Sequence, residues 1–138
     1  SLWSRGPEDE MLQTCRDLDV TFVAYAPLGR GFLTGSLDPA RLAADDFRRG
    51  NPRFQADALA RNQRLLDGLG AIAARRNASS GQIALAWLVD RAPGVVPIPG
   101  TRRVARLAEN SSAMDLALTR GEIAELGCAR RGSSAGST

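Results

Sequence analysis

Two short β-type segments constrain the fold of this chain more than any other feature of its sequence. VTFVAYA, residues 20–26, and VVPIP, residues 95–99, are rich in β-forming side chains, and helical patterns surround both. The first segment is apolar on both of its alternating faces, as a strand inside a parallel sheet is. The order helix, strand, helices, strand, helices predicts an α/β fold with right-handed crossovers between parallel strands.

Two strands, however, do not make a complete sheet. An isolated parallel pair leaves both edges and much of its faces uncovered, which proteins normally avoid. The chain has 138 residues, enough to bury one core, so a single domain is expected. We therefore predict that these residues form part of a larger unit that is marginally stable alone and able to self-associate through its exposed sheet edges.

Helix signals occur throughout the first two thirds of the chain. Pro7 suits the first position of a helix, and the three acidic residues after it favour the positive N-terminal end. The following apolar stripe is expected to belong to this helix: Met11, Leu12, Cys15 and Leu18. A longer, leucine-rich amphipathic helix is expected to end near Asn77. Ser79 and Gln82 have the spacing of a capping box for the next helix, whose apolar core IALAWLV predicts burial.

Two more helices are predicted in the last third of the chain. After the turn GTRR, a short helix is expected to direct three apolar residues inward: Val104, Leu107 and Ala108. Thr119 and Glu122 have the spacing of a second capping box, which predicts the start of a final helix.

Two other stretches are expected to lack a packed element. Residues 41–51 are polar and arginine-rich and are interpreted as an excursion over the surface. The end of the chain, GSSAGST, has the composition of a disordered segment. We therefore expect the domain to cover residues 1–128 and residues 129–138 to form a disordered tail.

The composition narrows the possible functions. All 18 basic residues are arginine, lysine and histidine are absent, and Tyr25 is the single tyrosine, so most general acid–base side chains are missing. The arginines are scattered without interleaved aromatic residues, which favours a solvated surface and argues against nucleic-acid binding. Two cysteines are too few for a disulfide framework, and no apolar run approaches the ~20 residues that span a bilayer. A cytoplasmic protein with neither a membrane segment nor a metal site is predicted.

Each predicted strand is followed by a glycine turn. PLGRGFLTG, residues 27–35, follows the first strand, and PGTRR, residues 99–103, follows the second. Ligands bind at the carboxyl ends of strands in parallel α/β folds, and glycines let backbone amides approach an anion closely. The spacing is neither that of a Walker motif nor the Rossmann GxGxxG, and glycines after a strand are also ordinary turn residues. Phosphate binding and simple turn formation therefore both stay open for these motifs taken alone.

Four longer motifs, in this order, closely resemble the carboxyl-terminal half of the aldo-keto reductases: SLWSR, FVAYAPLGRGFLTG, QIALAWL and VVPIPGTRRVARLAEN. Members of this family are (β/α)8-barrel enzymes that use NADPH to reduce aldehydes and ketones, and the resemblance runs from Ser1 to about Cys128. It implies that the two β-type segments are the seventh and eighth barrel strands. The expected fold class is thus α/β, the C-terminal portion of a (β/α)8 TIM barrel with two parallel strands and about five helices. A complete barrel typically needs about 250 residues.

The resemblance assigns several residues near the first glycine turn to NADPH binding. Tyr25 matches the tyrosine whose ring stacks on nicotinamide, which suits a flat aromatic face. Ala26 stands where many relatives have a serine, so it lacks the hydroxyl that would bond the cofactor. The loop over the cofactor pyrophosphate is matched by Leu28, Gly29 and Arg30. Trp3 matches an aromatic position that can face the substrate.

The same resemblance assigns residues near the second glycine turn to the adenosine end of NADPH. The 2′-phosphate turn is matched by Gly100, Thr101 and Arg102. Arg106 matches the arginine beside the adenosine phosphate or ring, and Glu109 and Asn110 match the adenine contacts. Arg103 is interpreted as a surface residue.

The family's catalytic residues, in contrast, have no counterpart here. Aldo-keto reductases use a tetrad of aspartate, tyrosine, lysine and histidine, which the resemblance places in the amino-terminal half. The function expected from the resemblance is therefore NADPH-dependent reduction of small-molecule carbonyl compounds by a complete enzyme, of which this chain retains the cofactor-binding lobe and is inactive alone. The alternative is a noncatalytic nucleotide-binding or regulatory module completed by a partner that supplies the missing strands.

Overall fold

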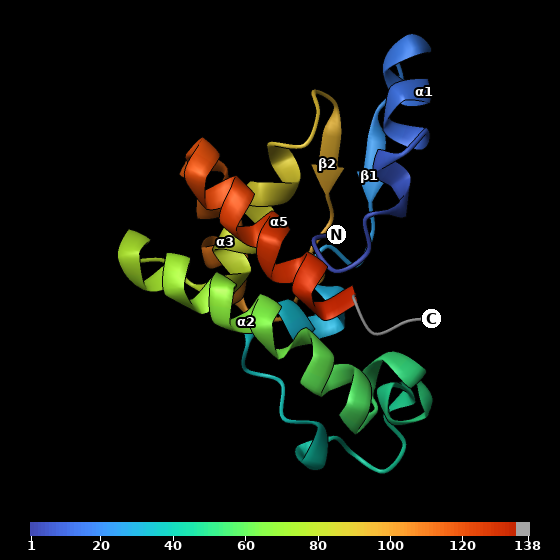
Figure 1. The fold of residues 1–138 in the computed structure, drawn as a ribbon, viewed down its shortest axis with the longest axis vertical. Helices are drawn as coiled ribbons and strands as arrows, with labels where there is room; N and C mark the ends of the chain where they lie inside the picture. Colours follow the sequence, from blue (N-terminus) through green and yellow to red (C-terminus); the bar gives the residue numbers. More distant parts are fainter. Residues whose placement is uncertain (135–138) are drawn as a thin grey trace.

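A computed structural model describes residues 1–134 of the chain, and residues 135–138 lie outside this description. Strands β1 (Phe22–Ala24) and β2 (Val95–Pro97) form a two-stranded parallel sheet in which Phe22 is opposite Val95 (Figure 1). The prediction of two parallel strands is confirmed, although both strands are shorter than the β-type segments. Extended backbone ends after β1 because Ala26 has a left-handed φ of 44°.

The first α-helix begins later than the acidic motif suggested. Pro7 lies in a separate 3₁₀ turn, η1 (Gly6–Glu8), and helix α1 (Met11–Asp17) starts three residues after that turn ends. Leu12 is buried, whereas Met11 and Leu18 are 53% and 67% exposed. The predicted start of the helix at Pro7 is therefore wrong, and its apolar stripe is only partly covered.

Three further helices begin or end where the sequence signals at their ends predicted. Helix α2 (Ala56–Arg76) ends at Asn77, whose left-handed backbone terminates the helix as predicted. Helix α3 (Ser80–Val89) begins with the predicted capping box of Ser79 and Gln82. Helix α5 (Arg120–Ser134) begins after a reciprocal pair of bonds between Thr119 and Glu122. It therefore occupies the first part of the segment expected to be a disordered tail.

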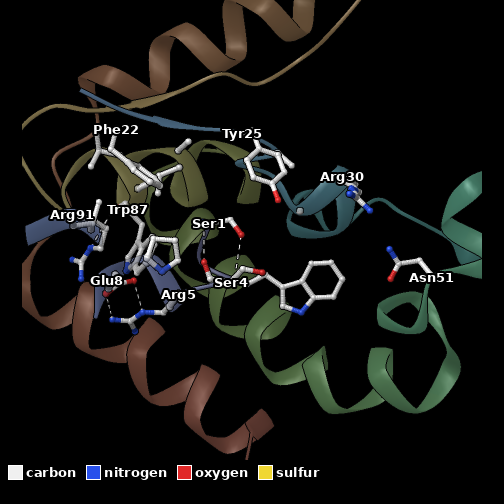
Figure 2. A pocket seen from close by; sticks show the side chains of 18 of the residues that line it. Ser1, Ser4, Arg5, Glu8, Phe22, Tyr25, Arg30, Asn51, Trp87 and Arg91 are labelled. Carbon is white, nitrogen blue, oxygen red and sulfur yellow. Dashed lines mark hydrogen bonds and ion pairs between the residues drawn. The ribbon is translucent and has the colours of Figure 1, made fainter. Parts of the chain in front are cut away.

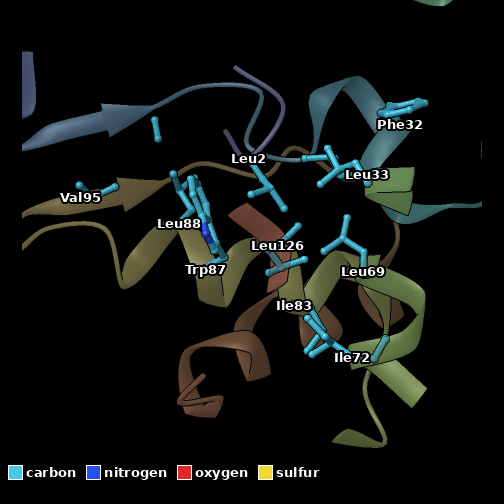
Figure 3. Close-up of a cluster of buried hydrophobic side chains, with 14 of the residues drawn as sticks. Leu2, Phe32, Leu33, Leu69, Ile72, Ile83, Trp87, Leu88, Val95 and Leu126 are labelled. Carbon is cyan, nitrogen blue, oxygen red and sulfur yellow. The ribbon is translucent and has the colours of Figure 1, made fainter. Parts of the chain in front are cut away.

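The hydrophobic core lies around α3, which packs against β2 and α2, while α5 packs along α2 (Figures 1 and 3). Trp87 and Leu88 of α3 belong to one core cluster with Val95 of β2. On the side of α2, the cluster continues through Leu69, Ile72, Ile83 and Leu126. The apolar sequence IALAWLV is buried as predicted because strand, loop and helices surround α3.

Helix α4 (Val104–Ser112) does not direct apolar side chains into this core. Val104 and Leu107 are 83% and 58% exposed, Ala108 is also exposed, and the helix contains no buried residue. Polar bonds from Glu109 and Ser112 to the start of α3 hold the helix by its C-terminal half. The prediction that these three residues face inward is therefore wrong.

The segment between the first glycine turn and α2 is a succession of short 3₁₀ turns. After η2 (Gly29–Thr34) come η3 (Pro39–Arg41), η4 (Phe47–Gly50) and η5 (Pro52–Phe54). Within residues 1–134, no helix combines the length and apolar character that crossing a membrane requires.

Candidate functional site

Two cavities adjoin the segments that follow the strands. The first cavity, of about 400 Å³, lies between the N-terminal segment, the end of β1 and the face of α3 (Figure 2). The second, of about 430 Å³, is called here the arginine cavity and is lined by Gly31, Thr34, Ser36, Leu37, Arg48, Thr101, Arg102, Arg103 and Arg106. It joins two glycine turns that are about 70 residues apart in the chain, as parallel strands with their carboxyl ends at one edge allow.

The glycine loop, residues 27–35, is shaped by a run of left-handed residues. Gly29, Arg30 and Gly31 have φ angles of 58°, 58° and 95°. A Cβ atom at Gly29 would lie 2.8 Å from Cε3 of Trp3, a separation that real Cβ atoms do not adopt. The carbonyl of Leu28 accepts bonds from the amides of Gly31 and Leu33, both at 3.1 Å. The glycines therefore serve a tight, defined turn and a close contact with Trp3.

Two aromatic residues of this region contribute to the first cavity in different ways. Tyr25 is 76% exposed and presents its ring at the edge of the cavity (Figure 2). Trp3 also lines the cavity, but its ring is stacked on Phe32 at 4.3 Å and meets Phe54 edge-on at 5.5 Å. Tyr25 is thus open to a flat ligand, whereas Trp3 is a fixed wall of the cavity.

The far wall of the first cavity is an arginine–tryptophan cluster that sequence reasoning did not identify. The Arg5 guanidinium donates two bonds of 2.6 Å to the carboxylate of Glu8 (Figure 2). Both Arg5 and Arg91 lie over the ring of Trp87, at 5.2 and 4.5 Å from its centroid. The bond to Glu8 raises the pKa of Arg5. Arg91 follows Trp87 by four residues and lies just past the end of α3 at Val89, so its spacing from the tryptophan could have indicated that contact.

The arginine cavity combines cations, hydroxyl groups and a left-handed glycine. Four arginines, Arg48, Arg102, Arg103 and Arg106, line it together with Thr34 and Thr101. Guanidinium forks match the oxygens of a phosphate, and hydroxyls add further donors. Arg103, interpreted from sequence as a surface residue, is exposed and also lines the cavity. The arrangement is suited to binding a polyanion.

Glu109 orients one of these arginines. Its carboxylate accepts a bond of 2.6 Å from Nη1 of Arg106 through one oxygen and a bond of 2.5 Å from the Ser79 hydroxyl through the other. The Ser79 bond, together with Arg106, lowers the pKa of Glu109 below its usual value. The carboxylate matched to an adenine contact thus links α4 to the start of α3 and holds Arg106 in place.

The structure brings most of the predicted cofactor residues to the two cavities. Tyr25, Ala26, Gly29 and Arg30 line the first, and Thr101, Arg102 and Arg106 line the second. The remaining predicted residues are not among the residues lining either cavity: Leu28, Gly100, Glu109 and Asn110. Leu28 packs instead against the hydrophobic core.

Arg48 is a residue of the arginine cavity that sequence reasoning also missed. It belongs to the stretch interpreted as a surface excursion, and it shares a bidentate ion pair with Asp46. The bonds from Arg48 lower the pKa of Asp46 to about 2. No motif marked this arginine among its neighbours in the stretch 41–51, because its approach to the glycine loop depends on the path of the chain.

Solved structures define the class of fold to which this arrangement belongs. The glycerol dehydrogenase AKR11B4 from Gluconobacter oxydans matches 93% of this chain with a TM-score of 0.84 and 25% identity. The thermostable aldo-keto reductase Tm1743, solved with the inhibitor epalrestat, matches 93% with a TM-score of 0.63 and 31% identity. The chain covers 39% and 36% of these two structures. Its two parallel strands and helices therefore form part of a (β/α)8 barrel.

Sequence comparison then places the chain within one family. The family model for the aldo/keto reductase family matches residues 1–129. The aldo-keto reductase yakc [NADP(+)] of Schizosaccharomyces pombe is 40% identical over 127 residues, and the probable aldo-keto reductase 1 of Glycine max is 35% identical over 126. These matches cover 91% of this chain but only 37% and 36% of the two relatives. The chain belongs to the aldo/keto reductase family and spans little more than a third of these relatives' length.

Proposed function

We propose that this chain is the cofactor-binding part of a cytoplasmic, NADPH-dependent reductase of small aldehydes and ketones. The observation that carries the proposal is the arginine cavity, which four arginines line together with residues of both glycine turns. The named NADP(+) dependence of the relative from Schizosaccharomyces pombe supports the choice of cofactor. Two cysteines in 138 residues suit a reducing compartment.

The residues present fit NADPH on chemical grounds. Arg102, Arg106 and Thr101 would hold the adenosine phosphate, and Gly29 with Gly31 would let the backbone approach the pyrophosphate. Tyr25, with its exposed ring, would cover the flat nicotinamide. When bound, NADPH would supply the hydride for carbonyl reduction.

The chain's own residues would bind and orient the cofactor and would not supply a proton donor. Histidine and lysine are absent from the sequence, and the single tyrosine is assigned to the nicotinamide. A positioned general acid typically contributes about 10²- to 10⁴-fold to the rate. We therefore propose that these 138 residues alone do not reduce carbonyl compounds and that reduction requires the remainder of a barrel.

Titration of the purified chain with NADPH, and separately with NADH, tests this proposal. Binding is followed by the fluorescence of Trp3 and Trp87. We expect saturable binding that favours NADPH, and Arg106→Ala should weaken NADPH binding about tenfold or more, because a hydrogen bond to a charged group contributes ~1.5–3 kcal/mol.

Arg120→Ala is the matched control, because this arginine is exposed at the start of α5 and lies outside the arginine cavity. It removes the same charge and should leave the affinity unchanged. A folded parent chain that binds neither dinucleotide would overturn the proposed function. Equal affinity for NADPH and NADH would overturn the assignment of the arginine cavity to the 2′-phosphate.

A further inference from the structure

The surface excursion, residues 41–51, returns to the glycine loop and contacts it at Arg30. Nη1 of Arg48 donates a bond of 3.0 Å to the backbone carbonyl of Arg30, 18 residues earlier in the chain. The guanidinium carbon of Arg30 lies over the ring of the neighbouring Phe47, 5.1 Å from the centroid of that ring. The segment therefore holds Arg30 by its backbone and by its side chain at once.

Asp46 fixes the orientation of the arginine that makes this contact. Its carboxylate accepts bonds from Nε of Arg48 at 2.9 Å and from Nη2 at 2.6 Å, and it also accepts the Arg48 amide at 2.9 Å. Both side chains are largely covered, with 24% and 16% of their surface exposed. A bidentate pair sets the plane of the guanidinium, which leaves Nη1 aimed at the glycine loop.

The backbone at the point of contact is one that needs support. Arg30 is not a glycine, yet its φ is 58°, and a left-handed conformation costs such a residue about 1–2 kcal/mol. Gly31 follows with a φ of 95° and lines the arginine cavity together with Arg48. The bond to the Arg30 carbonyl thus acts on the residues that shape one wall of that cavity.

We propose that Asp46 and Arg48 form a clamp that positions the glycine loop for phosphate binding. Asp46 is the informative member of the pair, because a carboxylate beside a phosphate site is unfavourable by charge alone. A carboxylate at this position is explained if Asp46 orients Arg48, so that Arg48 holds the glycine loop in place. Arg102 and Arg106 then supply the positive charge for the phosphate. The inference rests on the proposed function, since it specifies which residues prepare that site for a dinucleotide.

The variant Asp46→Asn distinguishes a geometric role of the ion pair from an electrostatic one, because the two roles predict opposite changes in NADPH affinity. It makes the site more positive, so a purely electrostatic role predicts tighter NADPH binding, whereas loss of the clamp predicts binding that is weaker by about fivefold to tenfold. Asp38→Asn is the matched control: it makes the same charge change between the glycine loop and α2, where Asp38 meets the exposed Arg41 at 3.4 Å. Unchanged or tighter binding by Asp46→Asn would overturn the clamp.

Rescue by the conservative substitution gives a second readout. Lysine can donate to the Arg30 carbonyl but cannot form the fork with Asp46. Arg48→Lys should therefore retain more NADPH affinity than Arg48→Ala but less than the parent. Equal affinities for the two variants would contradict a positioning role.

Amide hydrogen exchange tests the clamp without any cofactor. The amides of Gly31 and Leu33 both bond to the Leu28 carbonyl inside the glycine loop, so Asp46→Asn should speed their exchange, while Asp38→Asn should not. Unchanged exchange in Asp46→Asn would overturn the clamp. Absence of NADPH binding by the parent chain, in contrast, would overturn the proposed function, so the two failures are distinguishable.

Discussion

At the scale of single residues, the two glycine turns differ in whether their structure requires a glycine. Gly29 has a left-handed φ of 58° and no room for a Cβ atom beside Trp3. Gly100 matches a family glycine in the second turn, yet a Cβ atom placed there has no neighbour within 4 Å. Both backbone conformation and packing therefore require a glycine at residue 29. Neither requires one at residue 100 within this chain.

Gly29→Ala should lower the free energy of unfolding by about 1–3 kcal/mol, because alanine is strained at this φ and its methyl group collides with the indole. Urea unfolding followed by circular dichroism measures the change. Gly100→Ala is the control and should change stability by less than about 0.5 kcal/mol. Equal stability of Gly29→Ala and the parent would show that Trp3 does not pack on the loop.

At the scale of elements, the capping box of α5 links the stability of a helix to pH. The Thr119 amide donates a bond of 2.8 Å to the Glu122 carboxylate, and Arg76 lies 3.6 Å from the same group. The bond from Thr119, with a smaller effect of Arg76, lowers the pKa of Glu122 below its usual value of 4.5. The ionised Glu122 carboxylate therefore contributes fully to the free energy of unfolding above the pKa that this group has in the unfolded chain. The contribution is lost as the pH falls through the lower pKa of Glu122 in the folded chain.

Glu122→Gln should therefore lower the free energy of unfolding at pH 7 by about 0.3–1 kcal/mol, because glutamine can keep the capping-box bond but loses the negative charge near the helix N-terminus. It should also flatten the acid limb of the stability profile. The measurement is the free energy of unfolding between about pH 7 and about pH 3. The control is Glu10→Gln, an exposed glutamate ahead of α1, which should leave the parent profile in place. A parent profile without an acid limb would contradict this account of the cap.

At the scale of the whole molecule, one face of the sheet is apolar and uncovered. Val23 and Val96 are paired across the two strands, and they are 54% and 46% exposed, with Tyr25 and Ile98 exposed beyond them. The opposite face, with Ala24 and Val95, belongs to the core. Because the chain spans little more than a third of its relatives' length, we expect this face to associate in the isolated chain.

Sedimentation velocity over a range of concentrations measures that association. The double variant Val23→Ser with Val96→Ser should shift the chain towards monomer, because it removes apolar surface from the centre of the exposed face. Val104→Ser is the control, since Val104 is 83% exposed and belongs to α4, not to the sheet. A parent chain that stays monomeric at every concentration would contradict the prediction.

Local signals proved reliable where a capping box begins a helix or a left-handed residue ends it, although Pro7 did not mark the start of α1. The capping boxes of Ser79 with Gln82 and of Thr119 with Glu122 form as predicted, and α2 ends at Asn77. The same reasoning was wrong for α4, where a helical pattern predicted the helix but not the direction of its apolar face. Periodicity shows that a face is apolar; it does not show what lies opposite that face.

The sequence by itself determined the two parallel strands, the helix boundaries that caps define and membership of the aldo/keto reductase family, because these depend on short-range chemistry and on motif order. Only the tertiary structure revealed that Arg48 approaches Arg30 and that Glu109 holds Arg106. Such contacts join residues through the path of the chain and through shared hydrogen bonds, and the 3₁₀ segment that carries Arg48 has no periodicity from which its path could be predicted.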